Sequence, residues 1–225
     1  MSRVHDMGGR FGDPEVEPEP QGIPQFAADW HGRALALTIA AGAHGKWNID
    51  MSRHARECLA PKDYTRFSYY EKWLAGLADI LVQTGVLKPE DLLEEGQSEQ
   101  HHLAARTLTK NNVAAALAKG GPANREGGPK PAFAVGQPVR TRRLAENALN
   151  NGGHTRLPDY ASDARGQILR LHGTHVLPDS SAHQQGDAPE PLYAVVFDAS
   201  ELWAFPEHPK DKVVLDLWQS YLVPE

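Results

Sequence analysis

Arg156 stands in an unusual stretch of sequence, NNGGHTRLPDY at residues 150–160. The two Asn and two Gly residues are typical of a turn, which we expect Gly153 to allow, and Pro158 stiffens the chain just after Leu157. A guanidinium on so short and rigid a mount suits bidentate binding of an oxyanion. An ordinary solvent-exposed arginine is the alternative that the residue types leave open.

Arg53 and Arg56 form a second candidate, one turn apart in a predicted helix over 51–59. Such a pair most often belongs to a solvated face, unless a ligand or partner engages it. Cys58 follows late in the same helix beside Glu57. We expect Cys58 to be a buried structural thiol and not a nucleophile.

Two histidine pairs, His101-His102 and His172-x-x-His175, raise the possibility of a metal site. Neither pair has cysteines or carboxylates at ligand spacing, so surface and strand-end histidines are the simpler interpretation. We therefore predict that this chain binds no metal itself.

The composition bounds the classes of protein to which the chain can belong. Its 225 residues suffice for one large or two small domains, and the net charge of −6 disfavours a nucleic-acid binder. No apolar run approaches the roughly 20 residues of a spanning helix, and the N-terminus lacks the apolar core of a secretory signal. The single cysteine excludes an intrachain disulfide framework, so we expect a cytoplasmic protein without membrane contact.

The α+β layout is predicted to have three parts. Residues 1–24 form an extended arm rich in Pro and Glu, residues 25–130 an α-helical domain with a linker, and residues 131–225 a β domain. The β-type runs are FAVGQPVR, GQILRLHG, PLYAVVFD and KVVLDLWQSYL, separated by Gly, Pro and Asp turns. The pattern xVGxxVR followed by GxIxxLHG is typical of a small SH3-like barrel or roll.

The helical part shows clear start and stop signals. Apolar spacing predicts helices over 25–42, 51–59, 68–85, from Pro89 and over 109–119. We expect Asp50 to cap the second helix, and Ser68 with Glu71 to form a capping box for the third, which Gly85 ends. The third helix is apolar on two adjoining faces, so we expect it to be covered on more than one side.

In combination these segments resemble the β subunit of nitrile hydratase, in order along nearly the whole chain. The matching residues are VHDMGG at 4–9, Asp29-Trp30, Ile49-Asp50 with Arg53, Tyr69-Tyr70-Glu71 with Trp73, FAVGQPVR at 133–140, GHTRLPDY at 153–160, PLYAVVF at 191–197, Glu201-Leu202-Trp203 and LDLWQSYLVP at 215–224. HDxGG, the YYxxW helix and GHTRxPxY are specific when found together. The fused helical and barrel halves distinguish the chain from thiocyanate hydrolase, a relative in which these halves are separate chains.

The resemblance implies an enzyme subunit that takes part in hydrating nitriles to amides. The family's reaction occurs at a low-spin cobalt(III) or iron(III) ion, held by a C-x-x-C-S-C claw of the α subunit, with water or a sulfenate oxygen as nucleophile. Two claw cysteines are oxidised to sulfinic and sulfenic forms, and two β-subunit arginines hydrogen-bond their oxygens. By position these arginines are Arg53 and Arg156, which would act on the metal through its ligands.

The resemblance also assigns the walls of the substrate channel. Ile49, Tyr69 and Trp73 match wall positions, and Tyr69 is in addition expected to hydrogen-bond near the metal as part of the catalytic group. Trp203 and Trp218 are similar to the cobalt-type subunits, which favours cobalt over iron.

The implied partners are an α subunit, in an αβ unit that pairs again as α2β2, and a small nitrile. The chain departs from the family's R-G-K-x-G-x-V pattern at 162–168, where it reads SDARGQI. A non-catalytic accessory module, which docks an α subunit for metal insertion, is the alternative function. An RNA-binding SH3-like protein is disfavoured by the negative charge.

Overall fold

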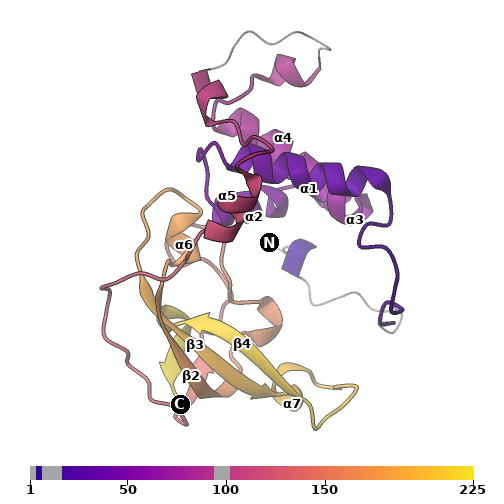
Figure 1. Cartoon of the computed structure of the whole chain (residues 1–225). Helices are drawn as coiled ribbons and strands as arrows, with labels where there is room; N and C mark the ends of the chain where they lie inside the picture. The colour runs from indigo at the N-terminus through magenta and orange to yellow at the C-terminus, as the bar shows by residue number, and fades with distance from the viewer. Residues whose placement is uncertain (1–3, 7–16, 94–101) are drawn as a thin grey trace. The chain divides into compact units, whose positions relative to one another are not determined.

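The computed structural model describes residues 4–6, 17–93 and 102–225, and it contains two compact units. One unit consists mainly of Gly9–Gly121 and is helical, and the other consists mainly of Pro122–Glu225 and carries the sheet (Figure 1). The α+β class predicted from the sequence is confirmed.

The helical unit is organised around one central helix. Its described helices are α1 (Asp29–Gly42), α2 (Ile49–Glu57), α3 (Pro61–Arg66), α4 (Tyr69–Gln83) and α5 (Val113–Lys119), with 3-10 turns at Pro89–Leu92 and His102–Arg106. Both α1 and α2 pack on α4. The small core between them contains Ala41, Ala55, Leu77 and Ile80. This packing fixes α2, which carries Arg53, against α4, which carries Tyr69 and Trp73.

Side-chain caps set the start of both site helices. The Asn48 side chain accepts a hydrogen bond from the Met51 N–H at 2.9 Å, so Asn48 caps α2 and the predicted Asp50 does not. The predicted capping box of α4 is confirmed, with the Glu71 carboxylate accepting from the Ser68 N–H at 2.7 Å. These caps place the residues of the first turns in defined positions.

Other helix boundaries differ from the prediction for local reasons. The predicted helix over 51–59 ends at Glu57, and a further short helix, α3, starts at Pro61, because proline is well suited to the first turn of a helix. The helix expected from residue 25 begins at Asp29, where no side chain caps it. The segment predicted to be helical from Thr109 becomes helical at Val113, since the Asn112 side chain accepts from the Thr109 N–H at 2.8 Å and holds a turn.

The other unit contains a five-stranded antiparallel sheet in the order β4-β3-β2-β1-β5. Its strands are β1 (Pro138–Thr141), β2 (Arg165–His175), β3 (Glu190–Asp198), β4 (Lys212–Trp218) and β5 (Leu222–Pro224). The sheet is not closed, because β4 and β5 form its two edges. Two register shifts in β2 bend the sheet, but a closed SH3-like barrel is not seen.

The sheet unit has its own core, which includes residues from the loop between β1 and β2. Tyr193, Phe197, Leu217 and Tyr221 are almost completely buried, and Leu157 from the Arg156 segment packs with them. The segment that carries Arg156 is therefore anchored in the buried core of this unit through Leu157.

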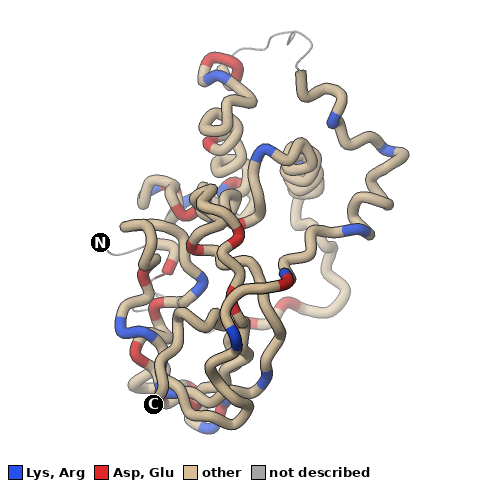
Figure 2. The backbone as a smooth tube through the Cα atoms, turned by 90° about the vertical axis from the view of Figure 1, so that its left-hand side faces the viewer, with Lys and Arg blue, Asp and Glu red and all other residues tan. Residues whose placement is uncertain are grey.

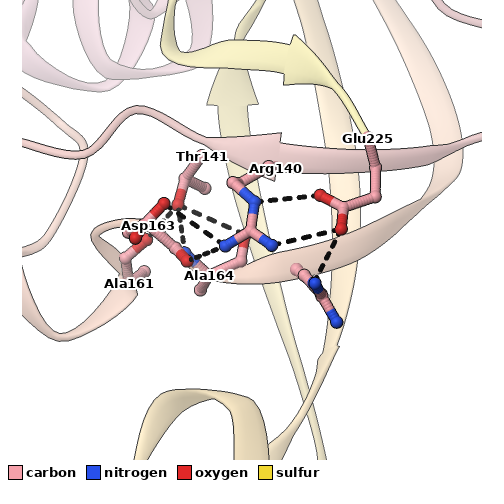
Figure 3. A network of polar contacts seen from close by, with 7 residues as sticks. Arg140, Thr141, Ala161, Asp163, Ala164 and Glu225 are labelled. Atoms are coloured by element: carbon pink, nitrogen blue, oxygen red, sulfur yellow. Dashed lines mark hydrogen bonds and ion pairs between the residues drawn. The ribbon is translucent and has the colours of Figure 1, made fainter.

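An ion-pair network fastens the C-terminus to the sheet (Figure 3). The Arg140 guanidinium donates to both Glu225 carboxylate oxygens, at 2.9 and 3.1 Å, and to the Asp163 carbonyl at 2.8 Å. Arg165 contacts the same Glu225 carboxylate at 2.6 Å. The segment 162–168, which departs from the family pattern, thus carries ion pairs of its own.

Charged residues of both signs are interspersed along the backbone (Figure 2). In the described part of the chain, no helix is both long and apolar enough to cross a membrane. Of the predicted arm, Val4–Asp6 forms a 3-10 turn and residues 17–24 lack helix and strand, while residues 7–16 lie outside the described residues. The arm stays a prediction.

Candidate functional site

The turn before Arg156 uses its two glycines for different reasons. Gly152 adopts a φ of +71°, which L residues rarely take, so it provides the turn that the sequence analysis assigned to Gly153. Position 153 has no room for a larger residue than glycine, since a Cβ there would lie 2.6 Å from Nε2 of His183 and 2.8 Å from Nδ2 of Asn147. The turn is therefore packed tightly into the unit.

Hydrogen bonds hold the backbone on both sides of Arg156. The Asn147 side-chain amide donates to the His154 carbonyl at 2.6 Å and to the Asp179 carbonyl at 2.9 Å. The His154 N–H in turn donates to Nε2 of His183 at 3.1 Å, and the His154 side chain is fully buried. The Arg156 N–H donates to the Tyr221 hydroxyl at 3.2 Å.

A buried Tyr–Asp pair also supports the backbone of the Arg156 segment. The Tyr221 hydroxyl donates to the Asp179 carboxylate, and both side chains are buried. Burial raises the pKa of Tyr221, and the neighbouring Asp179 charge raises it further, so the phenol keeps its proton. Burial also raises the pKa of Asp179. The phenol can then donate to Asp179 while accepting from the Arg156 backbone.

The Arg156 side chain itself points outward. It is exposed, and among the residues that the structure describes its guanidinium has neither an ion pair nor a hydrogen bond. A fixed backbone with a free guanidinium is the arrangement expected of a group that binds an anion from outside the chain.

Arg53 lies in the helical unit, and part of its guanidinium is hydrogen-bonded within the chain. Its Nη1 donates to the buried Asp50 carboxylate at 2.8 Å. The remaining guanidinium N–H groups have no partner among the described residues. Asp50 therefore orients Arg53 while leaving donors for a second oxyanion.

A pocket of about 280 Å³ in the helical unit combines cations with aromatic rings. Its lining includes Arg53, Arg56 and Lys72 together with Tyr64, Tyr69 and Trp73. The Tyr69 and Trp73 rings lie 5.6 Å apart. The structure thus brings three predicted site residues, Arg53, Tyr69 and Trp73, into one pocket.

Ile49 and Arg156 are not among the residues that line this pocket. Ile49, at the start of α2, is 63% exposed, and the pocket residue Tyr69 is 64% exposed. Such exposure of large apolar side chains is typical of a surface that a partner covers. Arg156 belongs to the sheet unit.

Several pocket residues were not assigned a site role from the sequence. The ammonium of Lys72 lies 4.4 Å from the centre of the Tyr64 ring, and the His5 ring lies 6.2 Å from that of Tyr64. Lys72 follows Tyr69 by three residues on α4, a spacing that could have suggested a shared face. Tyr64 lies on α3, a helix the sequence analysis did not predict.

The expectation for Cys58 was wrong, because its thiol is exposed. Cys58 is the C-cap of α2, and its Sγ lies 3.5 Å from Nε2 of His54. Glu57 approaches Nδ1 of the same imidazole at 3.6 Å. Cys58 and then Glu57 raise the pKa of His54 to about 9.

The described residues contain no group of three His, Cys, Asp or Glu side chains that could hold a metal. His172 instead contacts Asp216, with Nε2 2.8 Å from the carboxylate. His101 of the other predicted pair lies outside the described residues.

Comparison with known families covers nearly the whole chain. The family model described as "Nitrile hydratase beta subunit, N-terminal" matches residues 1–120, and its C-terminal counterpart matches residues 122–224. The chain belongs to the nitrile hydratase β-subunit family. It is thus part of a hydro-lyase system that hydrates nitriles to amides together with an α subunit.

Curated nitrile hydratase β subunits align over their full lengths or nearly so. The chain is 36% identical to the nitrile hydratase subunit beta of Pseudomonas putida over 225 residues, covering 100% of both chains. It is 31% identical to the low-molecular weight cobalt-containing nitrile hydratase subunit beta of Rhodococcus rhodochrous, again covering 100% of both. A cobalt-containing relative from Pseudonocardia thermophila is 29% identical, with 99% of this chain and 96% of the relative covered.

Proposed function

We propose that this chain completes the nitrile-hydrating site of an α subunit by hydrogen-bonding the oxidised cysteines that hold the metal. The observation that carries the proposal is Arg156, whose backbone is anchored on both sides and whose exposed guanidinium is unpaired among the described residues. Sulfinate and sulfenate oxygens in a water-poor interface need strong donors, and a planar guanidinium supplies two parallel ones.

Arg53 provides the second set of donors. Asp50 holds one edge of its guanidinium, so the other edge can reach an oxyanion without a large loss of side-chain entropy. Both arginines act on the metal through its ligands, because a hydrogen bond to a ligand oxygen withdraws electron density from that ligand.

The metal belongs to the α subunit in this proposal. No cluster of donors among the described residues of this chain fits a metal ion, and the claw thiolates are the ligands that would. Cobalt(III) is preferred to iron(III), supported by the cobalt-containing relatives and by the resemblance of Trp203 and Trp218 to cobalt-type subunits. When bound, the metal supplies Lewis-acid activation of the nitrile.

Ile49, Tyr69 and Trp73 form this chain's share of the substrate channel, and Tyr69 also hydrogen-bonds close to the reacting group. The contact between the Tyr69 and Trp73 rings and the exposure of Ile49 support a wall that is covered by the α subunit. Apolar walls exclude water and strengthen the hydrogen bonds of the arginines.

The assembly is an αβ unit that pairs as α2β2. We assign residues 1–24 to an extended arm, residues 25–130 to a helical domain and residues 131–225 to an SH3-like barrel domain. The open antiparallel sheet with its bent β2 belongs to this last domain.

Co-expression with the α chain tests the proposal. We expect a chain containing C-x-x-C-S-C, expressed with this one in the presence of cobalt, to convert a neutral nitrile to its amide, and the isolated β chain to convert none. If the α chain keeps full activity after this chain is removed, the accessory-module alternative holds and the proposal is wrong.

A further inference from the structure

Arg56 gives the pocket of the helical unit a second guanidinium, and the proposed function does not use it. Among the described residues, the pocket is lined by three cations, Arg53, Arg56 and Lys72, and by one carboxylate, that of Glu57. Arg53 is paired with Asp50, and Glu57 approaches the imidazole of His54. Arg56 is the cation whose position needs a separate explanation.

Three contacts hold the Arg56 side chain in place. Its Cγ lies where a side chain of Gly76 would be, since a Cβ on Gly76 would be 2.6 Å from that carbon. Its Nε donates to the Ser52 carbonyl at 3.1 Å. Its guanidinium lies over the Trp73 ring, with Cζ 4.7 Å from the ring centre.

Within the part of the chain that the structure describes, the charge of Arg56 is only partly compensated, by the nearby carboxylate of Glu57. Among the described residues, no carboxylate forms an ion pair with its guanidinium. Burial lowers the pKa of Arg56, and the like charge of Arg53 lowers it further, while Tyr69, Glu57 and Tyr64 raise it in part. An anion bound to the guanidinium would offset the cost of burying its charge, so the site favours a negatively charged ligand.

We propose that Arg56 makes this site select nitriles that carry a carboxylate group. The inference rests on the proposed function, which places Tyr69 and Trp73 in the substrate channel. A carboxylate matches the planar guanidinium in two parallel hydrogen bonds, while the Trp73 and Tyr69 rings contact the carbon chain that joins the carboxylate to the nitrile. The pocket volume of about 280 Å³ suits a small organic acid.

The test compares a cyano-carboxylate with its neutral isostere in the αβ holoenzyme. The probes are cyanopropanoate and cyanopropanamide, and the quantity measured is the ratio of their kcat/KM values. We expect Arg56→Met to lower this ratio about 10- to 100-fold, as the loss of a charge-assisted hydrogen bond predicts. Arg56→Lys should give a smaller decrease, because it keeps the charge and loses the fork.

Gly76→Ala tests the positioning without removing any charge. Its Cβ would displace Arg56, so we expect the ratio to fall in the same direction as in Arg56→Met. Lys62→Met is the matched control, since Lys62 is an exposed cation on α3 that does not line the pocket, and it should leave the ratio unchanged.

The outcomes separate the two proposals. If the holoenzyme hydrates cyanopropanamide and the ratio is the same in wild type, Arg56→Met and Gly76→Ala, the selectivity inference is wrong while the proposed function stands. If the holoenzyme hydrates neither probe nor any simple neutral nitrile, the proposed function fails and the inference fails with it.

Discussion

The backbone N–H of Arg156 donates to the hydroxyl of Tyr221, 65 residues further along the chain, at 3.2 Å. The same hydroxyl donates to the buried Asp179 carboxylate. A single phenol therefore connects the proposed anion-binding arginine to the last turn of the sheet unit. The position of Arg156 thus depends on the packing of the whole unit as well as on its own turn.

Tyr221→Phe should weaken both stability and activity. It removes the acceptor of the Arg156 N–H and leaves the buried Asp179 without its phenol donor, a cost of about 1–3 kcal/mol in the free energy of unfolding. We expect kcat of the αβ enzyme to fall ~10-fold or more through misplacement of Arg156. Chemical unfolding and steady-state kinetics on the same preparation measure the two effects.

Tyr193→Phe is the control for this experiment. Tyr193 is equally buried, and its hydroxyl accepts from the Ala132 N–H at 3.1 Å and donates to Gln219 at 3.0 Å, away from the Arg156 turn. It should lose comparable stability while keeping kcat. Equal kcat values in both variants would show that Tyr221 does not position Arg156.

Gly153→Ala and Gly152→Ala separate packing from backbone conformation. Gly153→Ala drives a Cβ into His183 and Asn147, so it should shift the turn and reduce activity strongly. Gly152→Ala meets no atom within 4 Å and should cost only the strain of its φ of +71°, about 1 kcal/mol. Activity and thermal unfolding of the two variants give the comparison, and a larger loss of activity in Gly152→Ala would contradict the packing role.

Local signals in the sequence were enough to predict much of the helical unit. Ser68 and Glu71 mark the start of α4 because the cap involves only neighbouring residues, and Gly85 marks its end with a φ of +68°. The short helix α3, which begins at Pro61, was not predicted, although proline is well suited to the first turn of a helix. Gly153 was misread because crowding by His183 arises from residues 30 positions away, which no local pattern reveals.

The candidate site was only partly predictable for the same reason. The spacing of Tyr69 and Trp73 placed them on one helix face, and the family resemblance singled out Arg53 and Arg156. The position of the Arg56 side chain depends on Gly76 of α4, which faces α2 and leaves room for it. This contact arises from the packing of two helices, which the sequence does not show. The sequence therefore showed an ordinary arginine pair where the structure shows one ion-paired and one stacked guanidinium.

His54 should make stability depend on pH. Its pKa in the folded protein is about 9 against 6.5 for the free group, so its contribution is fully present below pH 6.5 and is lost as the pH rises through 9. His54→Gln should lower the unfolding free energy by about 1–2 kcal/mol near pH 6, after allowance for solvent screening, and by much less above pH 9. Thermal midpoints across this range measure the effect.

Cys58→Ala separates the contributions of Cys58 and Glu57 to the raised pKa of His54. It removes the larger contribution to the His54 pKa and leaves Glu57 in place, so the pH dependence should shrink without vanishing. An unchanged pH profile in both His54→Gln and Cys58→Ala would contradict the assignment.

Arg156→Lys in the αβ enzyme tests the central claim most directly. Lysine keeps the positive charge but cannot form two parallel hydrogen bonds to oxidised-cysteine oxygens, so kcat for a neutral nitrile should fall ~10-fold or more with an intact αβ complex. Arg165→Lys is the matched control, since Arg165 is an exposed arginine of the same unit whose contact is with Glu225, and it should retain wild-type kcat. A wild-type kcat in Arg156→Lys would remove Arg156 from the site and contradict the account.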